Sequence, residues 1–262
     1  MRGLILCINI LFSILMVACE DNGSFGPSPA STSQLIPPPL VSHPNDGPII
    51  TDVEGNQYAT IQIGSQLWMK QNLRTKKYRN GNPILYQSTY YLTDTFTTGR
   101  YGENWWYSSP ISNFQIDSLK QVRTNYYGKW YNYYAVMDPR GLCPTGWHVP
   151  IKSEWDTLAE YLGNAMVAGD KLKTAGNSGA LLTENWWSGS NGNNSSGFSA
   201  VPGGSSGSSF PGQFAVFYFK EDSNNPAGGA ASIPYSGSYI WVSTPIDGLD
   251  PNAGASIRCL KD

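Results

Sequence analysis

The spacing of apolar residues predicts one helix clearly. After Pro150, apolar side chains recur at intervals of three and four residues, at Trp155, Leu158, Ala159 and Leu162. This spacing places them on one face of an α-helix, and Gly163 is suited to end that helix in a left-handed cap. A second, shorter helix is expected over residues 165–174.

Strand patterns are short and scattered. Over residues 58–63, Tyr58, Thr60 and Gln62 alternate with Ala59, Ile61 and Ile63, which is the period of a half-buried strand. A turn at residues 64–65 and a return strand from residue 67 follow. Further strands are expected over residues 213–220, 239–243 and 256–260. Two helices, short strands and long loops rich in Gly, Ser and Asn indicate an α+β fold.

The first 48 residues read as an export signal and a tether. Residues 4–17 form an apolar run that is too short to span a bilayer and suits the central region of a signal peptide. Residues 20–48 are rich in proline and serine and predict an extended tether. We therefore divide the chain into a signal peptide (1–18), a tether (19–48) and one folded domain (49–262).

Cys19 is the predicted site of lipid attachment. Residues 16–19, Met-Val-Ala-Cys, resemble the lipobox of bacterial lipoproteins, whose cysteine is acylated and becomes the mature N-terminus. Acyl chains there would anchor the protein to a membrane, although an ordinary cleaved signal peptide is the alternative. Glu20 and Asp21 resemble a surface-export signal. The expected location is therefore the outer membrane, with the domain on the cell surface.

Composition excludes several classes of function. The net charge is −2, so no basic excess exists to displace the counterions of a nucleic acid. Only two histidines occur, His43 and His148, which excludes a site built from several histidines. Charged residues make up 14 % of the chain, whereas aromatic residues make up 13 %. Aromatic side chains can pack long loops, because each covers a large area.

The cysteines left after export are predicted to form a disulfide. Cys7 leaves with the signal peptide and Cys19 would carry lipid, so Cys143 and Cys259 remain. Two thiols in an exported protein most simply pair. The alternative is a nucleophilic cysteine near His148, but no neighbouring motif supports a catalytic role for that histidine, and a satisfied structural histidine is the simpler interpretation.

Five ordered motifs resemble a known family. They are residues 64–73 with 78–81, 127–135, 141–150 followed by Glu154-Trp155, 194–204 and 257–262. Together they resemble the Fibrobacter succinogenes major paralogous domain, which occurs in exported lipoproteins of the Fibrobacteres and Bacteroidetes. The resemblance covers residues 52–262.

That resemblance implies a fold. The Trp-His-Val-Pro…Glu-Trp block is similar to one in formylglycine-generating-enzyme-like domains, whose fold is C-type-lectin-like: two helices packed on small twisted antiparallel sheets, with long loops forming the ligand face. Ile151 stands where those relatives have a capping threonine, and Ser153 is the candidate replacement. The copper-binding cysteines, iron-binding histidines and calcium-binding triplets of such relatives are missing. No catalytic residue, cofactor or metal is therefore expected, and the Asp- and Asn-rich segments 221–226 and 247–252 read as turns rather than calcium sites.

Clustered aromatic residues are the candidates for ligand contact. Aromatic faces stack on sugar rings and anchor protein interfaces, although packing of loops is the alternative role. In adjacent pairs the rings point in different directions, so one can be buried and the other presented. The candidates are Trp105, Trp106, Tyr107, Trp186 and Trp187. The expected function is non-catalytic recognition of an extracellular glycan or protein. The alternatives are an enzyme, of formylglycine-generating or carbohydrate-active type, and a structural subunit of a surface assembly.

Overall fold

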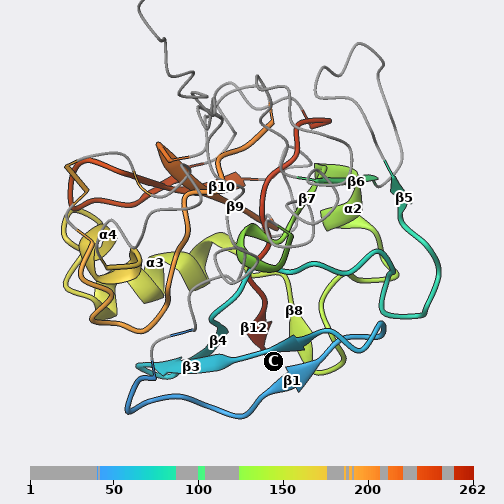
Figure 1. The fold of residues 1–262 in the computed structure, drawn as a ribbon, viewed down its shortest axis with the longest axis horizontal. Coiled ribbons are helices and arrows are strands. Elements are labelled where there is room, and N and C mark those ends of the chain that lie inside the picture. Colours follow the sequence, from blue (N-terminus) through green and yellow to red (C-terminus); the bar gives the residue numbers. More distant parts are fainter. Residues whose placement is uncertain are drawn as a thin grey trace, which may run out of the picture.

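The computed structural model describes residues 40, 42–86, 100–103, 124–175, 186, 189–190, 192–206, 212–220, 229–243 and 251–262. Its described helices are short: α2 (Tyr133–Met137), α3 (Lys152–Tyr161) and α4 (Ala168–Leu172). The described strands form small sheets that are antiparallel except for the pair β5–β6 (Figure 1). The predicted α+β class is confirmed.

Four sheets account for the described strands. The strands, in spatial order within each sheet, are β1 (Ile50–Thr51) and β2 (Gln57–Tyr58); β3 (Thr60–Ile63), β4 (Gln66–Met69), β12 (Leu260–Lys261) and β8 (Trp147–His148); β5 (Leu85–Tyr86), β6 (Arg100–Glu103) and β7 (Lys129–Tyr131); and β11 (Trp241–Ser243), β10 (Gly229–Pro234) and β9 (Phe214–Phe219).

The predicted hairpin of β3 and β4 is confirmed. Gly64 adopts φ +58° in the turn, a backbone conformation that suits glycine. Ile61 and Ile63 are buried and Gln62 is exposed, as the alternation predicts, but Thr60 is buried as well. The reason is that residues 45–48 cover it: the Thr60 hydroxyl donates to the carbonyl of Pro48 at 2.7 Å.

The predicted tether ends earlier than its composition indicates. Residues 43–48 lie along the outer edge of β3, where Asp46 forms a bridge with Ile61 and the backbone N–H of Gln62 donates to the carbonyl of Asn45 at 2.9 Å. Lys70, whose side chain is buried, forms an ion pair with Asp46. The folded part of the chain therefore includes residues that we placed in the tether.

Helix α3 packs its predicted apolar face into an aromatic core. Trp155, Leu158 and Ala159 are buried, and Gly163 follows the helix with φ +110°. The Trp155 ring stacks on Phe217 of β9 at 5.4 Å between centroids and lies 4.9 Å from the Trp68 ring of β4. One helix thus joins two sheets. α4 is shorter than the predicted second helix.

The N-terminus of α3 is capped differently from the expectation. Ile151 at the N-cap has no side-chain acceptor. Instead, Glu154 accepts the backbone N–H of Ile151 at 2.9 Å, which is the half of a capping box that the third helical residue supplies. Ser153 therefore does not provide the cap; its carbonyl accepts the hydroxyl of Thr157.

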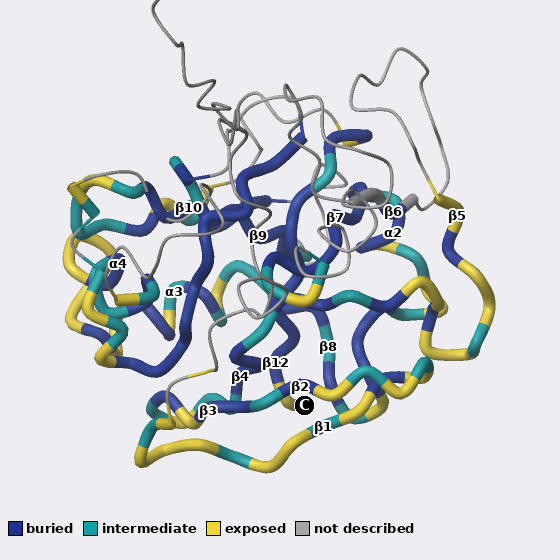
Figure 2. The backbone as a smooth tube through the Cα atoms, in the orientation of Figure 1, coloured by how far each residue is buried: buried dark blue, intermediate teal, exposed yellow. Residues whose placement is uncertain are grey.

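Residues 255–260 tie three sheets together. Ala255 bridges to Tyr131 of β7, Ser256 to Phe217 of β9, and Leu260 pairs with both Trp68 and His148. The predicted strand over residues 256–260 is therefore a thread between sheets, and only its end is a regular strand. Buried backbone runs through the centre of the molecule along this thread, with exposed segments around it (Figure 2).

Candidate functional site

Most of the predicted ligand-contact residues lie outside the described part of the chain, namely Trp105, Trp106, Tyr107 and Trp187. Cys19, the predicted lipidation site, lies outside it too. Trp186 is described, and its side chain is 3 % exposed. Its indole N–H donates to the Thr174 hydroxyl at 2.9 Å, and the Lys173 ammonium lies 5.8 Å from its ring centroid. Trp186 is a packing residue, which corrects its assignment as a ligand contact.

A different aromatic pair is presented on β11. Tyr239 and Trp241 are two residues apart, so an extended backbone points both rings to the same side. Their centroids are 4.9 Å apart, with an interplanar angle of 43°. Trp241 is 56 % exposed, whereas Ile240 between them is buried. An indole with this exposure can stack on a ligand.

Backbone hydrogen bonds from α4 and the loop before it hold the segment that carries this pair. The N–H of Gly169 donates to the carbonyl of Ser238 at 2.7 Å, and the N–H of Ile240 donates to the carbonyl of Ala165 at 2.8 Å. The second bond brings the loop before α4 alongside the pair, and Met166 in that loop is 69 % exposed. We call Tyr239 and Trp241 the β11 aromatic patch.

Lys173 fixes the turn that leads into the patch. Its side chain is fully buried, and burial lowers the pKa of its ammonium group below the ordinary 10.5, which the nearby Asp170 partly offsets. The ammonium donates to the carbonyls of Pro234, Tyr235 and Gly237 at 2.8–3.3 Å. A charged donor bonded to three carbonyls holds this turn in one conformation, so the patch is presented on a rigid support.

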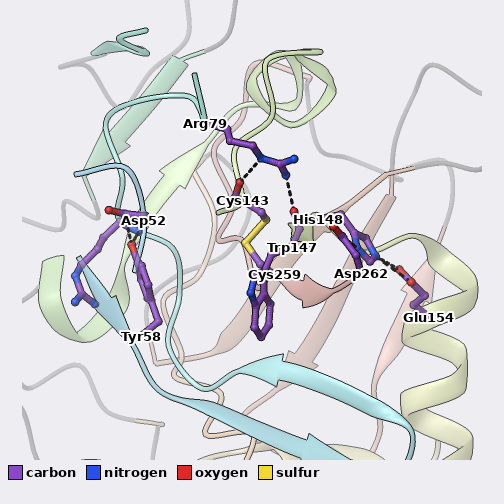
Figure 3. Close-up of a disulfide and its surroundings, with 10 residues drawn as sticks. Asp52, Tyr58, Arg79, Cys143, Trp147, His148, Glu154, Cys259 and Asp262 are labelled. Atoms are coloured by element: carbon purple, nitrogen blue, oxygen red, sulfur yellow. Dashed lines mark hydrogen bonds and ion pairs between the residues drawn. A yellow bond between two sulfur atoms is a disulfide. The ribbon is translucent and has the colours of Figure 1, made fainter. Parts of the chain in front are cut away.

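The predicted disulfide is present in the structure. Cys143 and Cys259 are bonded across 116 positions of sequence, with their Cα atoms 5.9 Å apart. Arg79 lies beside it and donates Nε to the carbonyl of Cys143 at 2.9 Å and Nη2 to the carbonyl of Trp147 at 2.5 Å (Figure 3). The disulfide leaves neither cysteine as a free nucleophile.

His148 lies between two carboxylates. Its Nδ1 is 2.7 Å from Asp262 Oδ1, and its Nε2 is 3.0 Å from both carboxylate oxygens of Glu154 (Figure 3). The hydrogen bond to Glu154 raises the pKa of His148 above 6.5; partial burial opposes this shift and the bond to Asp262 adds to it. Both ring nitrogens are engaged by acids, so neither faces a nucleophile that it could activate.

Neither a metal-binding cluster nor a membrane-spanning helix is found in the described part of the chain. Within the ranges given above, no three His, Cys, Asp or Glu side chains gather as a metal ion would require. The acidic segments 221–226 and 247–250 lie outside those ranges. The described helices include none that is long and apolar enough to cross a membrane.

The sequence predicted the disulfide. It did not predict the β11 aromatic patch or the two carboxylates around His148. Residues 239–243 were predicted as a strand, and the alternation of Tyr239 and Trp241 was the available signal for a shared face. The partners of His148 are 6 and 114 residues away. No local motif predicts a cluster that joins residues so far apart in the sequence.

Comparison with known proteins identifies one family. The family described as the Fibrobacter succinogenes major domain matches residues 61–261. No curated protein matches the chain, and no solved structure matches it.

Proposed function

Because the chain belongs to the Fibrobacter succinogenes major domain family, we propose that it is a non-catalytic recognition module displayed on a bacterial cell surface. Its ligand is an extracellular glycan or protein. The apolar leader and the lipobox-like ending at Cys19 support export and anchoring in the outer membrane. The disulfide supports an oxidising compartment outside the cytoplasm.

The β11 aromatic patch is the observation that carries this proposal. Trp241 exposes more than half of its surface, and Tyr239 supports its ring. A flat, rigidly mounted aromatic face suits the apolar face of a sugar ring or a side chain of a partner protein. We include a C-type-lectin-like fold in this proposal. In such a fold the sheets are small, and the long loops form the face that binds the ligand.

An enzymatic role has less support among the described residues. Of the two histidines, His148 is held between Glu154 and Asp262, and the ring of His43 bonds the backbone of Asn45 and Ser195. Both carboxylates are in turn occupied by the imidazole, and Glu154 also caps α3. A general acid or base needs an atom free to reach substrate.

Assembly through open sheet edges is also less supported for the four-stranded sheet. Residues 45–47 cover the outer edge of β3 with backbone hydrogen bonds. At the opposite edge, Arg79 occupies the carbonyl of Trp147 in β8. Covered edges oppose pairing with another chain.

Binding of the purified, detergent-solubilised lipoprotein to a glycan array and to extracellular protein fractions tests the proposal. Trp241→Ala should weaken binding at least about tenfold, because loss of an anchoring aromatic residue typically costs about 2 kcal/mol or more. Tyr161→Ala is the matched control, since Tyr161 is an exposed aromatic residue at the end of α3, 64 % exposed. Equal binding by the parent and Trp241→Ala would refute the assignment of the site.

A further inference from the structure

Residues from three elements of the fold meet at one imidazole ring. His148 comes from β8, Glu154 from the first turn of α3, and Asp262 follows β12 (Figure 3). The side chain of His148 is 34 % exposed, that of Glu154 26 % and that of Asp262 53 %. The cluster is therefore open to protons from solvent while two of its members are held in place.

The number of ring protons decides how many of these contacts can exist. A neutral imidazole carries one N–H and can donate to one carboxylate, whereas an imidazolium donates from both nitrogens. With the proton gone, a lone pair of the ring would face a carboxylate oxygen at 2.7–3.0 Å. The observed geometry, with an acid on each side, thus fits the charged ring.

The two carboxylates are not equally fixed. Glu154 also accepts the N–H of Ile151 at 2.9 Å and is anchored by its helix. Asp262 is held by the imidazole and by one backbone bond, from its N–H to the carbonyl of Gly146 at 3.1 Å. When the ring loses a proton, the hydrogen bond that breaks is therefore the one to Asp262, because Asp262 is the less restrained partner.

We propose that protonated His148 is a latch that holds Asp262 and the end of β12 against β8, and that deprotonation releases them. The latch is closed in mildly acidic surroundings and opens as the pH rises. Because the ring binds its proton more tightly in the folded state, its stabilising contribution is complete below about pH 6.5 and is lost as the pH rises through the folded-state value.

Other charged groups lie on the elements around the ring. The ammonium of Lys261 lies next to Gly146, and the guanidinium of Arg79 is bound to carbonyls on the other side of β8. On α3, Lys152 is paired with Asp156 at 2.7 Å. Lys220 extends from β9, where its backbone bridges to Ile151. The charges that act on the ring proton of His148 are those of Glu154 and Asp262.

A pH titration followed by NMR tests the latch on the full folded protein. The chain has two histidines, so His43 serves as the reference within the same sample. As His148 loses its proton, the backbone amides of Lys261 and Asp262 should become mobile with the same midpoint. Asp262→Asn should lower that midpoint by about half a pH unit or more, because it removes an opposite charge beside the ring.

Two variants separate the latch from a general effect on folding. Glu160→Gln removes an exposed carboxylate at the other end of α3 and should leave both the His148 midpoint and the mobility of Asp262 unchanged. Asp262→Asn alters an exposed side chain after the last strand, so the protein should still fold. Constant mobility of Lys261 and Asp262 between about pH 5 and about pH 9 would overturn the proposal, as would an unchanged His148 midpoint in Asp262→Asn.

Discussion

Arg258 shows how one residue can hold several segments together. Its guanidinium is buried and donates to the side chain of Asn72 and to three backbone carbonyls at 2.5–3.2 Å, those of Met69, Phe198 and Ser199. Among the described residues, no carboxylate is paired with it. Burial lowers the pKa of Arg258 from its ordinary value to about 9, so the group is still charged at neutral pH, and the rings of Phe198 and Phe217 flank it.

Replacing this guanidinium should therefore be costly. We expect Arg258→Met to lower the free energy of unfolding by about 3 kcal/mol or more, because it leaves several buried acceptors without donors. Arg258→Lys should recover part of that loss, since it keeps the charge but not the fork of donors. Chemical denaturation of both variants measures the difference. Arg258→Met with wild-type stability would mean that water satisfies the acceptors.

At the level of one element, α3 begins without the side-chain acceptor that helices usually have at the N-cap. Ile151 has extended backbone angles, φ −97° and ψ 167°, which are suitable for a capping residue. The backbone N–H of Glu154 lies close by, since it donates to the carbonyl of Ile151 at 3.2 Å. The position thus has the geometry of a cap and lacks its chemistry.

Supplying that acceptor should stabilise the protein. Ile151→Thr keeps a β-branched side chain and adds a hydroxyl oxygen, so we expect a gain of about 0.5–1 kcal/mol in the free energy of unfolding. Ile151→Val is the matched control, because it has the same branching without the oxygen. Thermal and denaturant unfolding of the two variants gives the comparison, and Thr less stable than Val would contradict the capping argument.

At the scale of the whole molecule, the disulfide and the thread of residues 255–260 act on the same part of the chain. Cys259 lies within this thread and is bonded to Cys143, which precedes β8. The bridge closes a long loop, and a covalent loop of this length restricts the unfolded chain strongly. It therefore secures the segment on which three sheets depend.

Reduction of the bridge should lower stability sharply. We expect the loss to approach about 4–5 kcal/mol, the chain-entropy value for a loop of this size. Unfolding in denaturant with and without a reducing agent measures it. The Cys143→Ser/Cys259→Ser double variant should be insensitive to the reductant, and a similar sensitivity in that variant would show that the reductant acts elsewhere.

The sequence predicted the parts of the fold that depend on neighbouring residues. The stripe on α3 and the turn at Gly64 are local patterns, and the structure has both. β10 was missed because its small residues show no alternation; it is buried between β9 and β11 and needs no large side chains to be covered. α2 was missed because it is five residues long and has aromatic residues, although Asn132 caps it by accepting the N–H of Ala135 at 3.0 Å.

The candidate site was less predictable than the fold. Pairs of neighbouring tryptophans were predicted as ligand contacts from the sequence. Trp186 is nevertheless buried, and its contacts with Thr174 and Lys173 are not predictable from any local pattern. Trp241 is exposed whereas Ile240 before it is buried, so the side of the chain that Trp241 occupies is left uncovered. Exposure is decided by which segments pack on one another, and such non-local packing cannot be read from spacing along the chain.

The position of β12 has a consequence for the order in which the sheet can form. β4 and β8 both precede β12 in the chain, yet β12 lies between them in the sheet. Long-range pairing of this kind slows folding and leaves strand edges open meanwhile. During synthesis or export, β4 and β8 would stay apart until β12 had emerged. Removal of residues 258–262 would therefore delete an inner strand of the sheet and not an edge strand.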